Sequence, residues 1–232
     1  MNKASIIITA ENPILNPRKI SPYPNLSTNY SVYLNTLLFS NWIEIFSEIN
    51  SQVEVSTIVS KEDKEHFPKY FLPDESHTIF YDNQQLSSLA EYLMQKPIIT
   101  NSKFLILFYN TIGFRPAGFQ RLFDLIQTDE PSIVIGKSIR NKVVFICTSD
   151  TDKTLLDSLI TSERKYEEYL NQISHKDIFI HTLDNFLSID DFEDIKKLYI
   201  ELSKKESLSY CSKKMHEGFN DLFIEYKELL NV

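Results

Sequence analysis

Short apolar runs alternate along the chain with segments of helical periodicity. Residues 104–109 (FLILFY) are apolar on both faces, which is typical of a strand covered by helices on two sides. Residues 4–10 form a β-branched run, and residues 53–59 alternate as a strand does. Strands that alternate with helices form a sheet between helical layers. We therefore predict an α/β protein, a three-layer α/β/α fold with a mixed, mostly parallel central sheet.

The other elements follow from the same patterns. Further strands are predicted at 79–81, 132–136, 143–147 and 177–182, and helical spacing marks segments beginning at Ser27, 86–95, from Pro116, 151–173 and from Asp190. We predict one α/β domain over 1–206 and a C-terminal amphipathic helix extension over 207–232. The apolar face of that helix either packs on its own domain or docks on a second subunit, as in a homodimer, or on a partner protein.

Composition and charge exclude several classes of protein. With 42% hydrophobic and 24% charged residues, the chain is not intrinsically disordered. The 24 Lys and Arg against 32 Asp and Glu give a net charge of −8, so no overall positive field attracts nucleic acid or a membrane surface. The longest apolar runs have five or six residues, whereas a membrane span needs about 20. We expect neither nucleic acid nor membrane as a partner.

Glycine is scarce, and its four residues stand apart at Gly113, Gly118, Gly136 and Gly218. Neither G-x-G-x-x-G nor G-x-x-x-x-G-K-[ST] occurs, which excludes dinucleotide Rossmann and P-loop sites. The two cysteines are far apart, and the first residues have too short an apolar run for a secretory signal. This predicts a reduced, cytoplasmic protein.

Four landmarks occur in order over residues 3–203. The first is a strand, a Pro-containing loop and a long helix (ASIIITAENPILNPRKI, NYSVYLNTLLFSNWIEIF), and the second is a strand, a turn and a Pro-led helix (FLILFYNTIGFRPAGFQRLFDLI). The third is a strand ending in Gly, a loop and a strand (SIVIGKSIRNKVVFIC), and the fourth is an acidic helix start (LSIDDFEDIKKL). In this order they resemble the glycosyltransferase-A-like bacterial nucleotide-diphospho-sugar transferases of the radical-SAM/selenodomain-associated type, with this chain as a divergent member.

The resemblance implies a nucleotide cleft at the strand ends. In the family, the turn after the central strand carries an acid expected to hold Mg²⁺ or Mn²⁺, whereas here this cleft turn carries Asn110 and Thr111. An amide offers only a neutral carbonyl oxygen, while Mg²⁺ prefers carboxylate ligands. We therefore predict no metal-ligating residue and nucleotide binding that is independent, or nearly independent, of metal. Mg²⁺ or Mn²⁺ stays open as a cofactor, although the acid that would hold it is absent.

Basic residues in the loops that should flank the cleft are candidate phosphate ligands, because Arg offers a two-pronged donor to phosphate. The predicted ligands of a nucleotide or nucleotide-sugar are Asn12, Arg18, Lys19, Arg115, Lys137, Arg140 and Lys142. The alternative for these loops is a solvated surface. The D-x-D pair Asp150 and Asp152 is predicted to serve helix capping rather than chelation.

Two functions from different classes are open. The first is glycosyl or nucleotidyl transfer from a nucleotide-diphosphate donor. The second is a catalytically degenerate transferase-like domain, a pseudoenzyme, that acts as a binding or assembly partner. The sequence assigns no catalytic residue to either, and fold alone does not decide between them.

Overall fold

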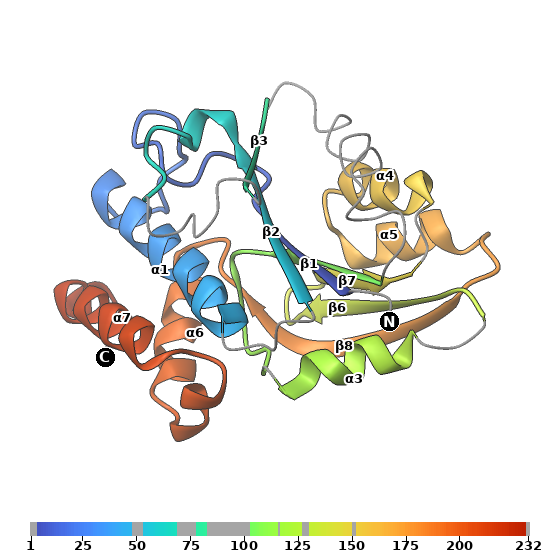
Figure 1. Ribbon diagram of the computed structural model, residues 1–232. Coiled ribbons are helices and arrows are strands. Elements are labelled where there is room, and N and C mark those ends of the chain that lie inside the picture. The colour runs from blue at the N-terminus through green and yellow to red at the C-terminus, as the bar shows by residue number, and fades with distance from the viewer. Residues whose placement is uncertain are drawn as a thin grey trace.

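The computed structural model describes residues 4–47, 53–68, 78–82, 103–115, 117–126, 130–149 and 152–230. In these residues eight strands form one sheet in the order β3-β2-β1-β4-β7-β6-β8-β5 (Figure 1). The strands are β1 (Ala4–Thr9), β2 (Val53–Ser60), β3 (Thr78–Tyr81), β4 (Phe104–Phe108), β5 (Thr111–Ile112), β6 (Ser132–Ser138), β7 (Val143–Thr148) and β8 (Phe179–Ser188).

The sheet is mixed. Strand β1 pairs in parallel with β2 and β4, β2 with β3, and β6 with β8. Strand β7 runs antiparallel to both β4 and β6, and β5 runs antiparallel to β8. The link between β6 and β7 covers only residues 139–142, which is far too short for the crossover that parallel neighbours need. Four parallel pairings against three antiparallel ones confirm the predicted mixed, mostly parallel sheet.

Helices cover both faces of the sheet. The helices of the described chain are α1 (Thr28–Ser47), α3 (Ala117–Leu125), α4 (Lys153–Thr161), α5 (Tyr166–Ile173), α6 (Phe192–Leu202), α7 (Lys213–Glu225) and α8 (Lys227–Leu230). Alternate residues of β1 face opposite ways: Ile6 and Ile8 pack with α1 and α3, whereas Ile7 packs with α4 and α5. Figure 1 shows these two helix pairs on opposite sides of the strands. The predicted three-layer α/β/α architecture is confirmed.

The C-terminal helices add a third cluster of buried side chains. Helix α7 packs on α1 and α6 and buries Met215, Phe219, Leu222 and Phe223. It approaches α1 so closely that a β-carbon at Gly218 would lie 2.5 Å from a methyl group of Leu37. The amphipathic face predicted in residues 207–232 is therefore buried against the same chain.

One predicted element cannot be compared with the structure, and two others have different bounds from those predicted. The helix predicted at 86–95 lies outside the described residues. The segment 151–173 divides into α4 and α5, because Glu163 and Arg164 between them take left-handed backbone angles of φ +50° and +62°. Strand β8 continues to Ser188, past the predicted end at residue 182, because it pairs with β6 and then with β5. No helix in the described ranges combines the length and apolar character that a membrane span requires.

Candidate active site

A polar cleft of about 440 Å³ lies beyond the carboxyl ends of β1 and β4. Its walls include the loop after β1 with Glu11 and Asn12, the turn after β4 with Asn110, and two residues from later in the chain, Arg164 and Asp190. Open α/β sheets bind ligands at this edge, where the strands end and the chain turns away. The cleft is thus the candidate active site.

A buried carboxylate holds the first loop of the cleft in place. Asp63, in the short helix η1 (Lys61–Asp63), is fully buried and accepts backbone hydrogen bonds from Ile14, Leu15 and Asn16 at 2.8–3.1 Å. These bonds satisfy consecutive N–H groups that a glycine-rich loop would turn toward a phosphate. Asp63 therefore fixes a loop that lacks glycine, and it occupies those three N–H groups.

Arg164 is the principal cation of the cleft and is only 4% exposed. Its Nε donates to the carbonyl of Val143 at 3.0 Å, its guanidinium lies 3.7 Å from the centre of the Phe108 ring, and its Nη1 lies 3.6 Å from Oε2 of Glu11. Its Nη2 is buried and has no hydrogen-bond partner among the described residues. Since an unsatisfied buried charged group is costly, this N–H group is suited to an anion that enters the cleft.

The turn between α4 and α5 puts Arg164 in this position. The N–H of Arg164 donates to the carbonyl of Leu159 at 3.2 Å, and its own carbonyl accepts from the N–H of Val143 at 2.7 Å. A left-handed conformation costs about 1–2 kcal/mol for a residue with a β-carbon, and here Glu163 and Arg164 adopt it in succession. Strain of this kind is often found at functional sites, where the surrounding structure holds it.

Asp190 also lines the cleft, and its carboxylate is already surrounded by donors. Oδ1 lies 3.0 Å from Nζ of Lys142 and 3.2 Å from Nδ2 of Asn110, and Oδ2 accepts from the Ser188 hydroxyl at 2.7 Å. Burial raises the pKa of Asp190, but the Ser188 hydrogen bond and the charges of Lys142 and Arg164 outweigh it, so the pKa lies below its usual value. Asp190 is therefore an ionised, fully engaged carboxylate.

The residues around Asp190 do not fit a divalent cation. Mg²⁺ and Mn²⁺ take several oxygen ligands, whereas an ammonium group and an amide N–H occupy Oδ1 of this carboxylate. In the part of the chain that the structure describes, no three His, Cys, Asp or Glu side chains gather as a metal site would require. These donors are already engaged with the Asp190 carboxylate.

The structure brings four of the sequence-predicted residues to the cleft. Asn12 and Lys19 line it on the side of the first loop, and Asn110 lines it on the side of the β4 turn. Lys142 reaches its edge through the contact with Asp190. The Asn110 amide donates to the carbonyl of Ile189 at 3.1 Å, while its Oδ1 is buried without a partner among the described residues.

Two predicted phosphate ligands are engaged with carboxylates outside the cleft lining. Arg140 contacts Asp191 through two nitrogens and Asp194 through Nε at 2.8 Å. The Asp194 side chain is fully buried. Lys137 pairs with Asp184 at 3.1 Å. An anion that recruited either cation would have to displace these carboxylates first.

Three further predicted residues lie away from the cleft lining. Arg18 is exposed beside Asn16, and Arg115 is exposed on the side of the molecule where its charge acts on Tyr210. Thr111 is fully buried behind the turn, and its hydroxyl donates to the carbonyl of Val144 at 3.4 Å. Asp152 accepts from the N–H of Thr154 at 2.8 Å, which confirms its predicted capping role at the start of α4. Asp150, the other member of the D-x-D pair, lies outside the described residues.

Arg164, like Glu11 and Asp190, lines the cleft but is not among the ligands predicted from the sequence. It lies in a segment whose apolar spacing runs on from Leu159 to Tyr166 without a glycine or proline to mark a turn. Its place depends on Val143 and Phe108, which are distant in the sequence. No local signal in the sequence identifies it.

Comparison with known proteins gives relatives in structure alone. No family model and no curated protein sequence matches the chain. A solved structure from Desulfovibrio desulfuricans G20, described as a nucleotide-diphospho-sugar transferase, matches with a TM-score of 0.68 at 12% identity over 100% of this chain and 98% of that one.

Two nucleotidyltransferase structures also match. The 4-diphosphocytidyl-2C-methyl-D-erythritol synthase of Anaerococcus prevotii has a TM-score of 0.54 at 16% identity, over 88% of this chain and 97% of that one. A cytidylyltransferase of Leptospira borgpetersenii has a TM-score of 0.53 at 14% identity, over 99% and 95%. The radical-SAM/selenodomain-associated subgroup stays a prediction, since none of these proteins bears on it. The chain has a divergent form of the nucleotide-diphospho-sugar transferase-like fold.

Proposed function

We propose that the cleft binds the diphosphate of a nucleotide or nucleotide-sugar donor, and that the protein acts in glycosyl or nucleotidyl transfer. The observation that carries this proposal is the buried, unpartnered Nη2 of Arg164 in a cleft at the carboxyl ends of the strands. The fold shared with nucleotide-diphospho-sugar transferases and cytidylyltransferases supports it.

The chemistry follows from the charges. Transfer from a diphosphate donor leaves negative charge on the departing phosphate oxygens, and a preoriented Arg donor stabilises that charge where water is excluded. Arg164 is held by Val143 and Phe108, so its Nη2 is already oriented before an anion arrives. Lys19, Lys142 and Asn12 supply further donors at the rim. In this proposal cationic side chains do the work that a divalent metal does in related enzymes.

Calorimetric titration of UDP, CDP and GDP into the full chain tests the proposal. Arg164→Gln is expected to lower the affinity for the best ligand by about 10- to 100-fold, because a hydrogen bond to a charged group contributes roughly 1.5–3 kcal/mol. Arg121→Gln, on the exposed side of α3, is the matched control and should leave affinity unchanged. Circular dichroism melting of both variants separates a lost contact from a lost fold.

Arg140→Ala and Lys142→Ala test the ligands predicted from the sequence. A loss of affinity in Arg140→Ala equal to that in Arg164→Gln would place the phosphates at the loop between β6 and β7. Unchanged affinity in Arg140→Ala, with a loss in Arg164→Gln, supports binding in the cleft. If Arg164→Gln folds and binds as the wild type does, the proposal is wrong.

Metal dependence is tested in the same titrations with and without Mg²⁺ or Mn²⁺. We propose that affinity changes less than tenfold, because an ammonium group and an amide N–H already occupy Oδ1 of Asp190. A gain of tenfold or more, about 1.4 kcal/mol, contradicts metal-independent binding.

The second candidate function is a transferase-like domain that binds without turnover. The engaged carboxylate of Asp190 and the neutral Asn110 favour it, since neither offers a free general base. Phosphorus NMR of nucleotide-sugars incubated with the protein separates the two: product formation supports the enzyme, and binding without product supports the second candidate.

A homodimer or partner contact through the C-terminal helix also remains a proposal. The large apolar side chains left exposed there are Ile224, at 73%, and Leu229, at 48%. Light scattering of the wild type and Ile224→Lys tests it, because a dimer that this substitution dissociates supports the contact and a monomeric wild type contradicts the homodimer.

A further inference from the structure

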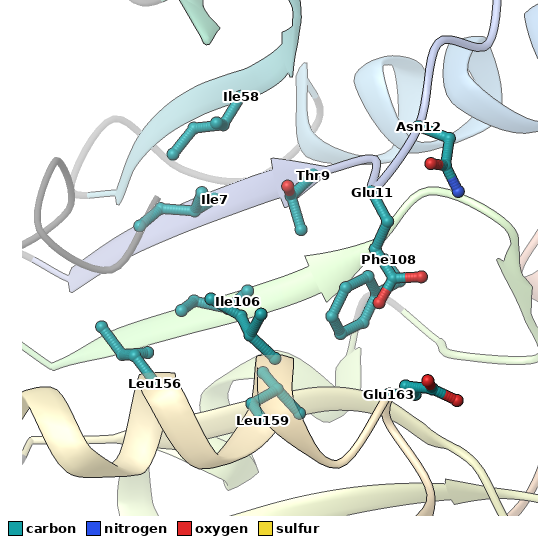
Figure 2. A pocket seen from close by; sticks show the side chains of 11 residues that line it. Ile7, Thr9, Glu11, Asn12, Ile58, Ile106, Phe108, Leu156, Leu159 and Glu163 are labelled. Carbon is teal, nitrogen blue, oxygen red and sulfur yellow. The ribbon is translucent and has the colours of Figure 1, made fainter. Parts of the chain in front are cut away.

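A second cavity, of about 140 Å³, lies between the sheet and α4, beside the polar cleft (Figure 2). Its wall on the sheet side comes from β1, β2 and β4, and its wall on the helix side comes from α4. The apolar lining side chains are Ile7, Ile58, Ile106, Phe108, Leu156 and Leu159. The cavity shares Glu11, Asn12 and Phe108 with the cleft, so the two spaces adjoin.

One polar atom in this apolar lining lacks a partner. Thr9 is 2% exposed, its side chain extends from β1 on the same face as Ile7, and its hydroxyl oxygen has no hydrogen bond with any described residue (Figure 2). A buried hydroxyl without a partner is unfavourable, because it has lost its hydrogen bonds to water. A ligand atom that forms a hydrogen bond with this hydroxyl removes that cost. The hydroxyl thus points to a ligand with a polar atom of its own.

Two carboxylates border the cavity. Glu11 and Glu163 both line it, and their partners are loose: Oε2 of Glu11 lies 3.6 Å from Arg164, and Oε2 of Glu163 lies 3.7 Å from Lys165. Carboxylates accept hydrogen bonds, so they favour a ligand that donates a hydrogen, and their negative charge disfavours an anion.

We propose that this cavity binds one ring-sized apolar group that carries an N–H or O–H donor. The volume of the cavity indicates a ligand of the size of one ring, because a cavity of about 150 Å³ lined by aliphatic and aromatic side chains holds benzene. The Thr9 hydroxyl and the carboxylates of Glu11 and Glu163 indicate that this ring carries a hydrogen-bond donor. This site takes a neutral ring, whereas the cleft at Arg164 takes an anion, so each stands or falls without the other.

Methyl NMR on the full chain tests the site directly. With ¹³C-labelled Ile and Leu methyl groups, aniline is titrated as the donor ring, toluene as the ring without a donor, and benzoate as the anionic ring. Aniline is expected to shift the methyl signals of Ile7, Ile58, Ile106 and Leu156, and benzoate is expected to leave them unchanged. Aniline shifts that spare these methyls, or benzoate binding that matches aniline, overturn the proposal.

Two variants separate the polar contact from simple filling of space. Thr9→Val keeps the shape of the side chain and removes the hydroxyl. It should lower the affinity for aniline at least threefold, while toluene binds as well as before or better. An equal effect on both rings contradicts the role of Thr9. Leu156→Phe fills the cavity and should abolish binding of both rings while leaving nucleotide affinity at Arg164 unchanged; retained ring binding in a folded Leu156→Phe protein places the rings elsewhere and overturns the site.

Discussion

Single residues in unusual environments build the cleft. Arg164 is charged, buried and only partly hydrogen bonded, and with Glu163 it takes a backbone conformation that side chains with a β-carbon rarely adopt. Contacts to Val143 and Phe108 hold it there. The backbone strain is confined to this turn, and the turn places the Arg164 guanidinium at the cleft.

Glu163→Gly is expected to stabilise the protein by about 0.5–1 kcal/mol. Relief of the left-handed strain gains about 1–2 kcal/mol, and the greater freedom of glycine in the unfolded chain takes back about 0.5–1 kcal/mol. Urea unfolding measures the difference. Glu163→Ala is the control, because it removes the same exposed carboxylate but keeps the β-carbon. Equal stability in both variants would show that the turn is not strained.

At the scale of elements, the ends of α4 fix the cavity and the cleft. Asp152 caps its first turn, and the turn with Arg164 ends it. The Asp152 carboxylate also contacts Lys176, and this contact, with the N–H of Thr154, lowers its pKa to about 2. The first turn of α4 therefore depends on an ionised side chain.

Asp152→Ala is expected to lose about 1 kcal/mol of stability at pH 7, the usual contribution of an N-cap. Because the folded pKa is lowered from 3.8 to about 2, the wild-type advantage is present above pH 4 and disappears as the pH falls through 2. Denaturation at pH 7 and pH 2 measures this. Asp152→Asn keeps the capping oxygen without the charge, so it should lose less than Asp152→Ala; the reverse order would contradict capping.

The β6–β7 hairpin depends on a close approach at Gly136. A β-carbon there would lie 2.2 Å from the ring of Phe145, which is fully buried and packs edge-on against Phe114 and Phe186. Gly136→Ala is expected to cost about 1–3 kcal/mol, because the ring has no room to move. Gly118→Ala, whose β-carbon would lie 3.4 Å from Phe114, is the control and should cause no loss. Chemical unfolding of both variants compares them.

At the scale of the whole molecule, the three layers are joined to the C-terminal helices through α1. One side of α1 packs on the sheet with α3, and the other side packs on α7, where Leu34 and Leu38 meet the apolar face of that helix. Figure 1 shows α7 beside α1. The extension is thus part of the core of the described chain.

Phe219→Ala is expected to cost about 3–5 kcal/mol, because the ring is fully buried in the cluster between α1 and α7. Ile224→Ala on the same helix is the control, and its 73% exposure predicts a change within about 0.5 kcal/mol. Thermal unfolding followed by circular dichroism measures both. A small loss in Phe219→Ala would mean that α7 contributes little to the fold.

The sequence by itself determined the elements and the fold class. Apolar runs such as 104–108 and the helical spacing from Ser27 are local patterns, because the side-chain periods of strand and helix depend only on backbone geometry. Asp152 as a cap is local as well, since its partner is two residues away.

Only the tertiary structure decided which charged side chains face the cleft. Arg140 lies in the predicted loop, yet its partners Asp191 and Asp194 come about 50 residues later and draw it to α6. Arg164 carries no motif, and the turn that positions its guanidinium is held by a strand and a ring far away in the sequence. Charge pairing and left-handed turns depend on neighbours that only folding brings together. For this reason the elements could be predicted, and so could four residues at the cleft, whereas Arg164 could not.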